Sequence, residues 1–406
     1  MPRGLRGRTV AAALALVATS GCTGGSDASP GVQPTPSASS SGSPATPDPW
    51  PGTTAVPGDP AHAVSPPGPL RDPLLPADLL VYSQQPLSPR TVARVARLPG
   101  VGATEQLSLA QVGIENRVIT VAAVDPATYR RFTPVTSARL RPVWTRVAEG
   151  EVAITPWLGR RLADPGGVLR LGNDSDAPGV HVGALAPQIP RVDAVVNERW
   201  GEDLGMRMGN ALLVSTGRLV APQRVRPAIE RIVGDQASVQ ILGPDLDTSV
   251  RQTAFLTGGS VAQSVGTFSY VVLDHGRIAP DPAWVAANIR TEEVPILGRV
   301  TCHRVMLPQL RAALTEVVMD GLAGAIHPDE YAGCYYPRYI AGTTQLSLHS
   351  FGIALDLNVP GNRRGTVGEI DRRVVAIFKK WGFAWGGDWA WTDPMHFEMN
   401  ALVQPR

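Results

Sequence analysis

The stretch SLHSFGIALD, residues 347–356, determines the architecture of the carboxyl-terminal part of this 406-residue chain. From Ile353 onward apolar and polar side chains alternate, which is the two-residue period of a half-buried strand. Asp356 therefore projects from the face opposite the apolar core, and Gly352 permits a sharp turn that folds His349 back beside it. An imidazole and a carboxylate placed in this way are two ligands of a zinc site.

A second stretch, DPMHFE at residues 393–398, supplies the remaining groups. His396 and Glu398 share one face of a strand, so His396 is the expected third zinc ligand, and a fourth position is left for water. Asp393 lies in the turn before this strand, where its carboxylate can act as general base and then as general acid, or can serve only the turn. Glu398 fits better as a partner that orients a ligand than as the base, although both roles stay open.

These two stretches, Ser-x-His-x-x-Gly-x-Ala-x-Asp and then Asp-x-x-His-Phe-Glu, resemble the VanY-type zinc D-alanyl-D-alanine carboxypeptidases. That group includes L-alanyl-D-glutamate endopeptidases, which cut peptidoglycan stem peptides. The resemblance spans residues 266–402 and implies a small zinc-peptidase domain of the DD-peptidase/hedgehog-like kind. Carried over, His349, Asp356 and His396 bind Zn²⁺ and Asp393 is the catalytic acid/base. The family often has Glu at that last position and its endopeptidase branch has Asp, so either bond remains a candidate.

Two further site residues follow from the same resemblance. Arg338, in CYYPR at residues 334–338, matches the substrate-binding arginine that precedes the histidine motif. An arginine can grip a substrate carboxylate or stabilise a developing oxyanion, so Arg338 is expected to bind substrate and assist catalysis; a structural ion pair is the alternative. Ser347 can hydrogen-bond substrate or serve only the turn before His349.

The first residues of the chain concern its location. Arginines, an apolar run at residues 10–17 and small residues ending at Cys22 form a secretory signal over residues 1–22. A Cys in that place resembles a bacterial lipobox, so we expect a lipid on Cys22; ordinary secretion without it is the alternative. Residues 23–76 are rich in Ser, Pro and Gly and are expected to form a disordered tether. The expected location is outside the cytoplasm, anchored to the cell membrane and facing the cell wall.

Residues 77–245 show a strand–helix–strand order twice, once from Leu79 to Val101 and once from Leu212 to Leu242. Two such units around a β-rich insertion predict a split βαβ domain of the α+β class. This arrangement is similar to the extracytoplasmic core domain of MacB-type transporter permeases. The segments that carry the likeness are VDP (124–126), GEVAI (150–154) and LGM (204–206). Nothing here has catalytic spacing, so contact with a protein partner or a spacer role is expected.

A linker is expected at residues 246–265 and the catalytic domain at residues 266–406. There, a helix is predicted from Leu307 to Gly321, and another after Thr366 and Glu369, which have capping-box spacing. Three cysteines occur in the chain. Since an exported protein meets an oxidising compartment and lipidation would consume Cys22, Cys302 and Cys334 are expected to form a disulfide.

The net charge of +2 gives no argument for nucleic acid as a partner. No segment approaches the roughly 18 apolar residues that span a bilayer. The sequence therefore predicts an exported zinc metallopeptidase that hydrolyses an amide bond of peptidoglycan stem peptides. D-alanyl-D-alanine carboxypeptidase activity is favoured, with L-alanyl-D-glutamate endopeptidase activity left open. A catalytically inactive wall-binding or transporter-associated scaffold is the alternative; the complete ligand set and Asp393 argue against it. An amidase that cuts the sugar–peptide bond is disfavoured because the motifs match the peptidases.

Overall fold

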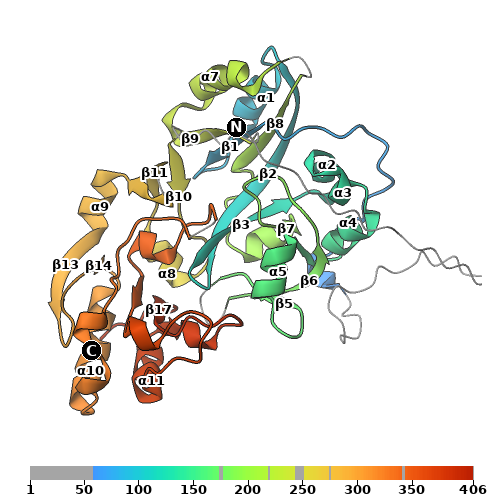
Figure 1. Ribbon diagram of the computed structural model, residues 1–406. Coiled ribbons are helices and arrows are strands. Elements are labelled where there is room, and N and C mark those ends of the chain that lie inside the picture. Colours follow the sequence, from blue (N-terminus) through green and yellow to red (C-terminus); the bar gives the residue numbers. More distant parts are fainter. Residues whose placement is uncertain are drawn as a thin grey trace, which may run out of the picture. The chain divides into compact units, whose positions relative to one another are not determined.

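The computed structural model describes residues 58–172, 177–217, 220–242, 251–273, 276–340 and 343–405. The expected signal peptide, Cys22 and residues 23–57 of the expected tether lie outside these ranges. No described helix is long and apolar enough to cross a membrane. Helices and several separate sheets make the described structure mixed α and β, in agreement with the expected α+β class (Figure 1).

Both predicted strand–helix–strand units are present in the amino-terminal region. The first consists of β1 (Leu79–Ser83), α1 (Pro89–Ala96) and β2 (Val101–Ile114). The second consists of β8 (Ala211–Thr216), α7 (Pro222–Val233) and β9 (Ala237–Ile241). The four strands are antiparallel in the order β2-β8-β1-β9, and both helices pack on one face of them. Ser88 begins α1 as the N-cap, because its hydroxyl accepts a hydrogen bond from the amide of Thr91.

The insertion between β2 and β8 extends this sheet, to nine strands among the described residues. Outward from β2 the added strands are β3 (Arg117–Val124), β7 (Ala194–Asn197), β4 (Val152–Ile154), β6 (Gly179–Leu185) and β5 (Val168–Arg170). One face is covered by α2 (Pro126–Tyr129) and α4 (Arg141–Ala148), with α3 (Val135–Ala138) between them in sequence. The other face is covered by α5 (Pro156–Leu162) and α6 (Trp200–Asp203).

β2 and β3 form a long hairpin whose turn is Glu115 and Asn116. Both residues have positive φ, 47° and 59°, as in the type I′ turns that match the twist of antiparallel strands. Next to the turn, the hairpin meets residues far along the chain. The amide of Val118 donates to the carbonyl of Leu346, and Arg117 forms an isolated antiparallel bridge with Ser347.

The described residues of the carboxyl-terminal region form three small sheets around one core. The first contains β10 (Gln252–Ala254), β11 (Phe268–Val272) and β12 (Ile278–Pro280), and the second is the hairpin of β13 (Ile289–Val294) and β14 (Gly298–His303). The third has the order β15 (Ala354–Asp356), β17 (His396–Met399), β16 (Phe383–Trp385). The helices are α8 (Gly259–Val265), α9 (Pro282–Asn288), α10 (Leu307–Met319) and α11 (Arg372–Lys380).

Three boundaries differ from those expected from the sequence. The first is the linker at residues 246–265: Ala254, Val261 and Val265 are buried in the carboxyl-terminal core, so residues 251–265 belong to that structure. The second is the capping box. α11 begins after Asp371, whose carboxylate accepts from the amide of Arg373, because Gly368 (φ 76°) interrupts the helical backbone after Thr366. The capping-box prediction is therefore wrong.

The third boundary is the end of the expected tether. Residues 58–76 lie against the amino-terminal region: the His62 ring stacks on Trp200 with centroids 3.6 Å apart, and the amide of Val64 donates to the carbonyl of Ala148. The sequence argument concerned a segment that folds alone. This segment instead packs on the surface of the folded amino-terminal region, so it needs no hydrophobic core of its own.

Candidate metal centre

His349, Asp356 and His396 converge, and their ligand atoms all lie within 4.8 Å of one another. His349 lies on a short 3-10 helix, Leu348–Phe351, which is capped by Ser347 and ends at Gly352 with φ 70°. This left-handed residue reverses the chain into β15, and a Cβ there would lie 2.8 Å from the backbone nitrogen of His303. Asp356 on β15 pairs directly with His396 on β17, which brings their side chains to the same face.

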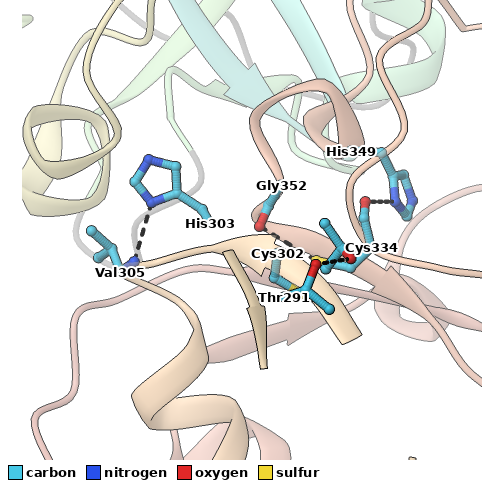
Figure 2. Close-up of a disulfide and its surroundings, with 8 residues drawn as sticks. Thr291, Cys302, His303, Val305, Cys334, His349 and Gly352 are labelled. Carbon is cyan, nitrogen blue, oxygen red and sulfur yellow. Dashed lines mark hydrogen bonds between the residues drawn. A yellow bond between two sulfur atoms is a disulfide. The ribbon is translucent and has the colours of Figure 1, made fainter. Parts of the chain in front are cut away.

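The outward nitrogen of each histidine has a protein partner. Nδ1 of His349 lies 2.9 Å from the carbonyl oxygen of Cys334 (Figure 2), and Nε2 of His396 lies 3.0 Å from Oε2 of Glu398. The other nitrogens, Nε2 of His349 and Nδ1 of His396, are 3.3 Å apart. They lie 3.4 and 3.0 Å from the two carboxylate oxygens of Asp356. Two imidazoles anchored from behind, with a carboxylate between them, fit a Zn²⁺ ion.

Burial and neighbouring charges shift the pKa values of these ligands in opposite directions. Burial by itself raises the pKa of Asp356, but the two adjacent imidazoles lower it well below its ordinary value. Burial disfavours the charged form of His396, while its hydrogen bonds to Asp356 and Glu398 raise its pKa to about 10. The carboxylates are thus arranged to favour positive charge at this point, as a cation site requires.

Asp393 is buried beside the ligands, with 8% of its surface exposed. Its amide donates to the carbonyl of Gly386 and its carbonyl accepts from the amide of His396, so the turn before β17 is held by backbone contacts. Among the described residues Oδ1 has no hydrogen-bond partner, while Oδ2 lies 3.8 Å from Nε of Arg364. Burial raises the pKa of Asp393 above its ordinary value. A free carboxylate oxygen in this environment suits a general acid/base.

Glu398 and Ser347 are both fully buried and both contact the hairpin turn of the amino-terminal region. Oε2 of Glu398 accepts from the amide of Asn116 at 2.8 Å, in addition to its contact with His396. This geometry fits the expected orienting role better than that of a base. The Ser347 hydroxyl donates to Oδ1 of Asn116 and accepts from the amide of His349. Of the two roles left open for Ser347, the turn role is the one these contacts favour.

Arg338 and the two cysteines precede the histidine motif. The Arg338 guanidinium lies over the ring of Tyr336, 5.5 Å from its centroid, and within the described ranges no contact joins it to the three ligands. Its substrate role stays a prediction.

Cys302 and Cys334 are joined by a disulfide with Cα atoms 5.4 Å apart. Because the carbonyl of Cys334 is the partner of His349, this bridge holds the backbone behind a candidate ligand (Figure 2).

The tryptophans that flank the second motif have different surroundings. Trp385 is buried and its Nε1 donates to the carbonyl of Pro394. Trp389 is half-buried, with its ring 5.2 Å from that of His396, whereas Trp391 is 56% exposed. Trp389 therefore lies beside the ligand set, and Trp385 serves the core.

The sequence interpretation missed Asn116 entirely. The pair Glu115 and Asn116 between two β-rich runs is a signal for a hairpin, since Asn tolerates positive φ. The local sequence gives no signal that Asn116 lies at the site, because its contacts there join residues more than 200 positions apart.

Residues 341–399 match the family of D-alanyl-D-alanine carboxypeptidases. The matched segment contains the three candidate ligands, Asp393 and Glu398, and it supports a peptidase that acts on peptidoglycan. A comparison with curated proteins finds no match to the chain. The likeness of residues 77–245 to the permease domain has no support from these comparisons.

Proposed function

We propose that this protein is an exported zinc peptidase that hydrolyses an amide bond of peptidoglycan stem peptides, with D-alanyl-D-alanine carboxypeptidase activity favoured. One observation carries the proposal: His349, Asp356 and His396 converge beside the buried carboxylate of Asp393, within a segment that matches that peptidase family. A scaffold without activity would have no need for this complete set.

A bound zinc ion would supply a Lewis acid that polarises the scissile carbonyl and makes water a stronger nucleophile. The residues of this chain do the rest. Cys334 and Glu398 hold the two imidazoles from behind, which leaves Nε2 of His349 and Nδ1 of His396 to face inward. Oδ1 of Asp393, which has no hydrogen-bond partner in the described part of the chain, takes a proton from the attacking water and returns it to the leaving amine.

The location proposed for the enzyme is the outer face of the cell membrane, with a lipid on Cys22. Supporting it are the arginine-rich start, the apolar run and the small residues that precede Cys22. The disulfide between Cys302 and Cys334 suits an oxidising compartment. A protein partner for residues 77–245 is part of the same proposal.

The test is mass spectrometry of a defined stem pentapeptide incubated with the purified, zinc-loaded protein. Release of the terminal D-alanine identifies a carboxypeptidase, and release of the amino-terminal L-alanine identifies an endopeptidase. The Asp393→Asn protein is the control for contaminating hydrolases. An unchanged substrate after prolonged incubation, with zinc shown to be bound, would contradict the proposal.

A further inference from the structure

The turn of the β2–β3 hairpin is fixed to the surroundings of the metal centre. The amide of Asn116 donates to Glu398 at 2.8 Å. Its side-chain oxygen accepts from the Ser347 hydroxyl at 2.8 Å and from the Leu348 amide at 3.0 Å. Three hydrogen bonds on one residue, together with the bridge between Arg117 and Ser347, hold the turn in a defined position. The charged neighbours of Asn116 are therefore held near the site as well.

Arg117 is the first of these charged neighbours. It is only 3% exposed, its guanidinium lies 5.8 Å from the ring centroid of Trp157, and its Nε is buried without a hydrogen-bond partner in the described part of the chain. Trp157 and Arg161 are four residues apart on α5 and so share a face of that helix. Nε and Nη2 of Arg161 are likewise buried and unpartnered among the described residues.

Arg364 completes the group from the carboxyl-terminal side, where its Nε lies 3.8 Å from Asp393. The three guanidinium groups act on one another. Burial, with the positive charges of Arg161 and Arg364, lowers the pKa of Arg117 to about 10, so it still carries its charge at neutral pH. Burial and Arg364 also lower the pKa of Arg161. Asp393 in turn acts to raise the pKa of Arg117 and of Arg161, so three positive charges from two parts of the chain lie around this one carboxylate.

The carboxylates on the protein leave this cluster with excess positive charge. Burial raises the pKa of Glu115 to about 7, although Arg161 and Arg117 oppose the shift, so near neutrality this residue supplies only part of one negative charge. Asp393 is a second carboxylate near the cluster, with Oδ2 3.8 Å from Nε of Arg364. Glu398, which also acts on Glu115, is engaged with His396 and the amide of Asn116. Arg364 is partly exposed, but Arg117 and Arg161 have buried N–H donors without partners among the described residues, and such buried cations are costly unless an anion meets them. The arrangement therefore suits an anion that arrives with the substrate.

We propose that Arg117, Arg161 and Arg364 form a carboxylate-binding subsite of the active centre, built jointly by the β2–β3 hairpin, α5 and the loop before α11. This inference rests on the proposed function and adds to it the part of the substrate that is gripped. Arginine binds a carboxylate through paired, charge-assisted hydrogen bonds. A stem peptide offers such a group at its carboxyl terminus and on its γ-linked D-glutamate, and the subsite holds one of them while Asp393 acts on the amide bond.

The test measures peptide binding to the metal-free full chain by titration calorimetry, so that hydrolysis does not enter. The probes are the pentapeptide L-Ala-γ-D-Glu-L-Lys-D-Ala-D-Ala, its carboxyl-terminal amide, and the version with D-isoglutamine in place of D-glutamate. We expect one of the two neutralised peptides to bind about tenfold or more weakly than the parent. The peptide that loses affinity identifies which carboxylate is held.

Variants assign the effect to the cluster. Arg161→Gln and Arg364→Gln should abolish the preference for the acid over its amide. Their exposed neighbours Arg160→Gln and Arg363→Gln should keep it. Arg117 is buried, so Arg117→Met is read only after thermal unfolding shows that the variant folds.

Equal affinity of the acid and both amides for the parent protein would overturn the proposal. So would an unchanged preference in Arg161→Gln and Arg364→Gln, or no measurable binding of the acid at millimolar concentration. A zinc-loaded protein that binds the acid with this preference but cleaves nothing would instead contradict the proposed function and leave the subsite in place.

Discussion

The backbone amide of Asn116 donates a hydrogen bond to Glu398, 282 residues further along the chain. The same carboxylate oxygen lies 3.0 Å from Nε2 of His396. A turn in the amino-terminal region thus holds the group that orients a candidate metal ligand. This relationship gives residues 77–245 a structural part in the site, beyond the spacer role expected for them.

Replacing Asn116 by Gly should keep the positive φ and the amide donor but remove the side-chain acceptor for Ser347 and Leu348. Leaving these two buried donors without partners should cost about 1–3 kcal/mol of unfolding free energy. Asn116→Asp retains the acceptor oxygens and is the matched variant. Urea unfolding measures both; a glycine variant as stable as the parent would show that the two side-chain hydrogen bonds of Asn116 contribute nothing to stability.

Removing either histidine ligand should remove the metal. We expect one zinc per chain in the parent and little in His349→Ala or His396→Ala, because each loses one of three ligands. His327→Ala is the control, since the His327 ring is half-exposed and pairs with Glu330, while its bond to Asn358 comes from the backbone amide and is kept in the variant. Elemental analysis of purified proteins decides the point, and near-full zinc in either ligand variant would refute the assignment.

Asp393→Asn should keep the zinc and lose hydrolysis. Backbone contacts, rather than the carboxylate, hold the turn at Asp393, so the structure should survive, but the amide cannot accept a proton. Loss of a positioned acid/base should lower turnover by a factor of about 10² to 10⁴. Glu398→Gln should cost less and should act partly through zinc affinity. The comparison is made at full zinc occupancy; if only Glu398→Gln is inactive, the base has been misassigned.

Breaking the disulfide should weaken the carboxyl-terminal region. Cys302 and Cys334 are 32 residues apart, so the bridge should contribute roughly 3–4 kcal/mol by restricting the unfolded chain. The Cys302→Ser, Cys334→Ser double variant should unfold at correspondingly lower urea concentration. Its zinc affinity should also fall, because the carbonyl of Cys334 contacts His349. Thiol titration of the denatured, unreduced parent gives the direct check: reactive thiols from both residues would mean that no bridge forms.

Acid should destabilise the fold through His303. This residue is fully buried; its Nε2 lies 3.2 Å from the carbonyl of Val265, and Nδ1 accepts from the amide of Val305 (Figure 2). Burial lowers its pKa from 6.5 to about 4. The unfolded chain therefore binds a proton before the folded one does, and stability falls as the pH drops from 6.5 toward 4, by about 2 kcal/mol at pH 5. Urea unfolding of the parent and of His303→Gln is measured at neutral pH and at pH 5. The variant should lose the difference in unfolding free energy between the two conditions; an equal pH dependence in parent and variant would exclude His303 as its source.

Much of the site follows from local sequence. The alternation after Ile353 places Asp356 opposite the core face, and Gly352 allows the turn that brings His349 close. These relations span ten residues or fewer, so backbone geometry alone determines them. The strand–helix–strand units of the amino-terminal region are local in the same sense, and their strands and helices lie where the periodicity predicts.

Where the sequence prediction was wrong, contacts from outside the segment decided the outcome. Thr366 and Glu369 have the right spacing for a cap, but Asn362 accepts from the amides of Glu369 and Ile370, and Asp371 caps α11 instead. Residues 251–265 look like a linker in isolation, yet α8 packs into the carboxyl-terminal core.

Residue identity and spacing in this chain determine which side chains can bind a metal and which local turns present them. The tertiary structure alone decides that Asp356 and His396 lie opposite each other on two paired strands and that Asn116 donates to Glu398. It also brings Arg117, Arg161 and Arg364 near Asp393. The physical reason is that these contacts join segments from 29 residues apart to more than 280, where hydrophobic periodicity carries no information about register. Packing of the whole core, rather than any one segment, selects among the possible pairings.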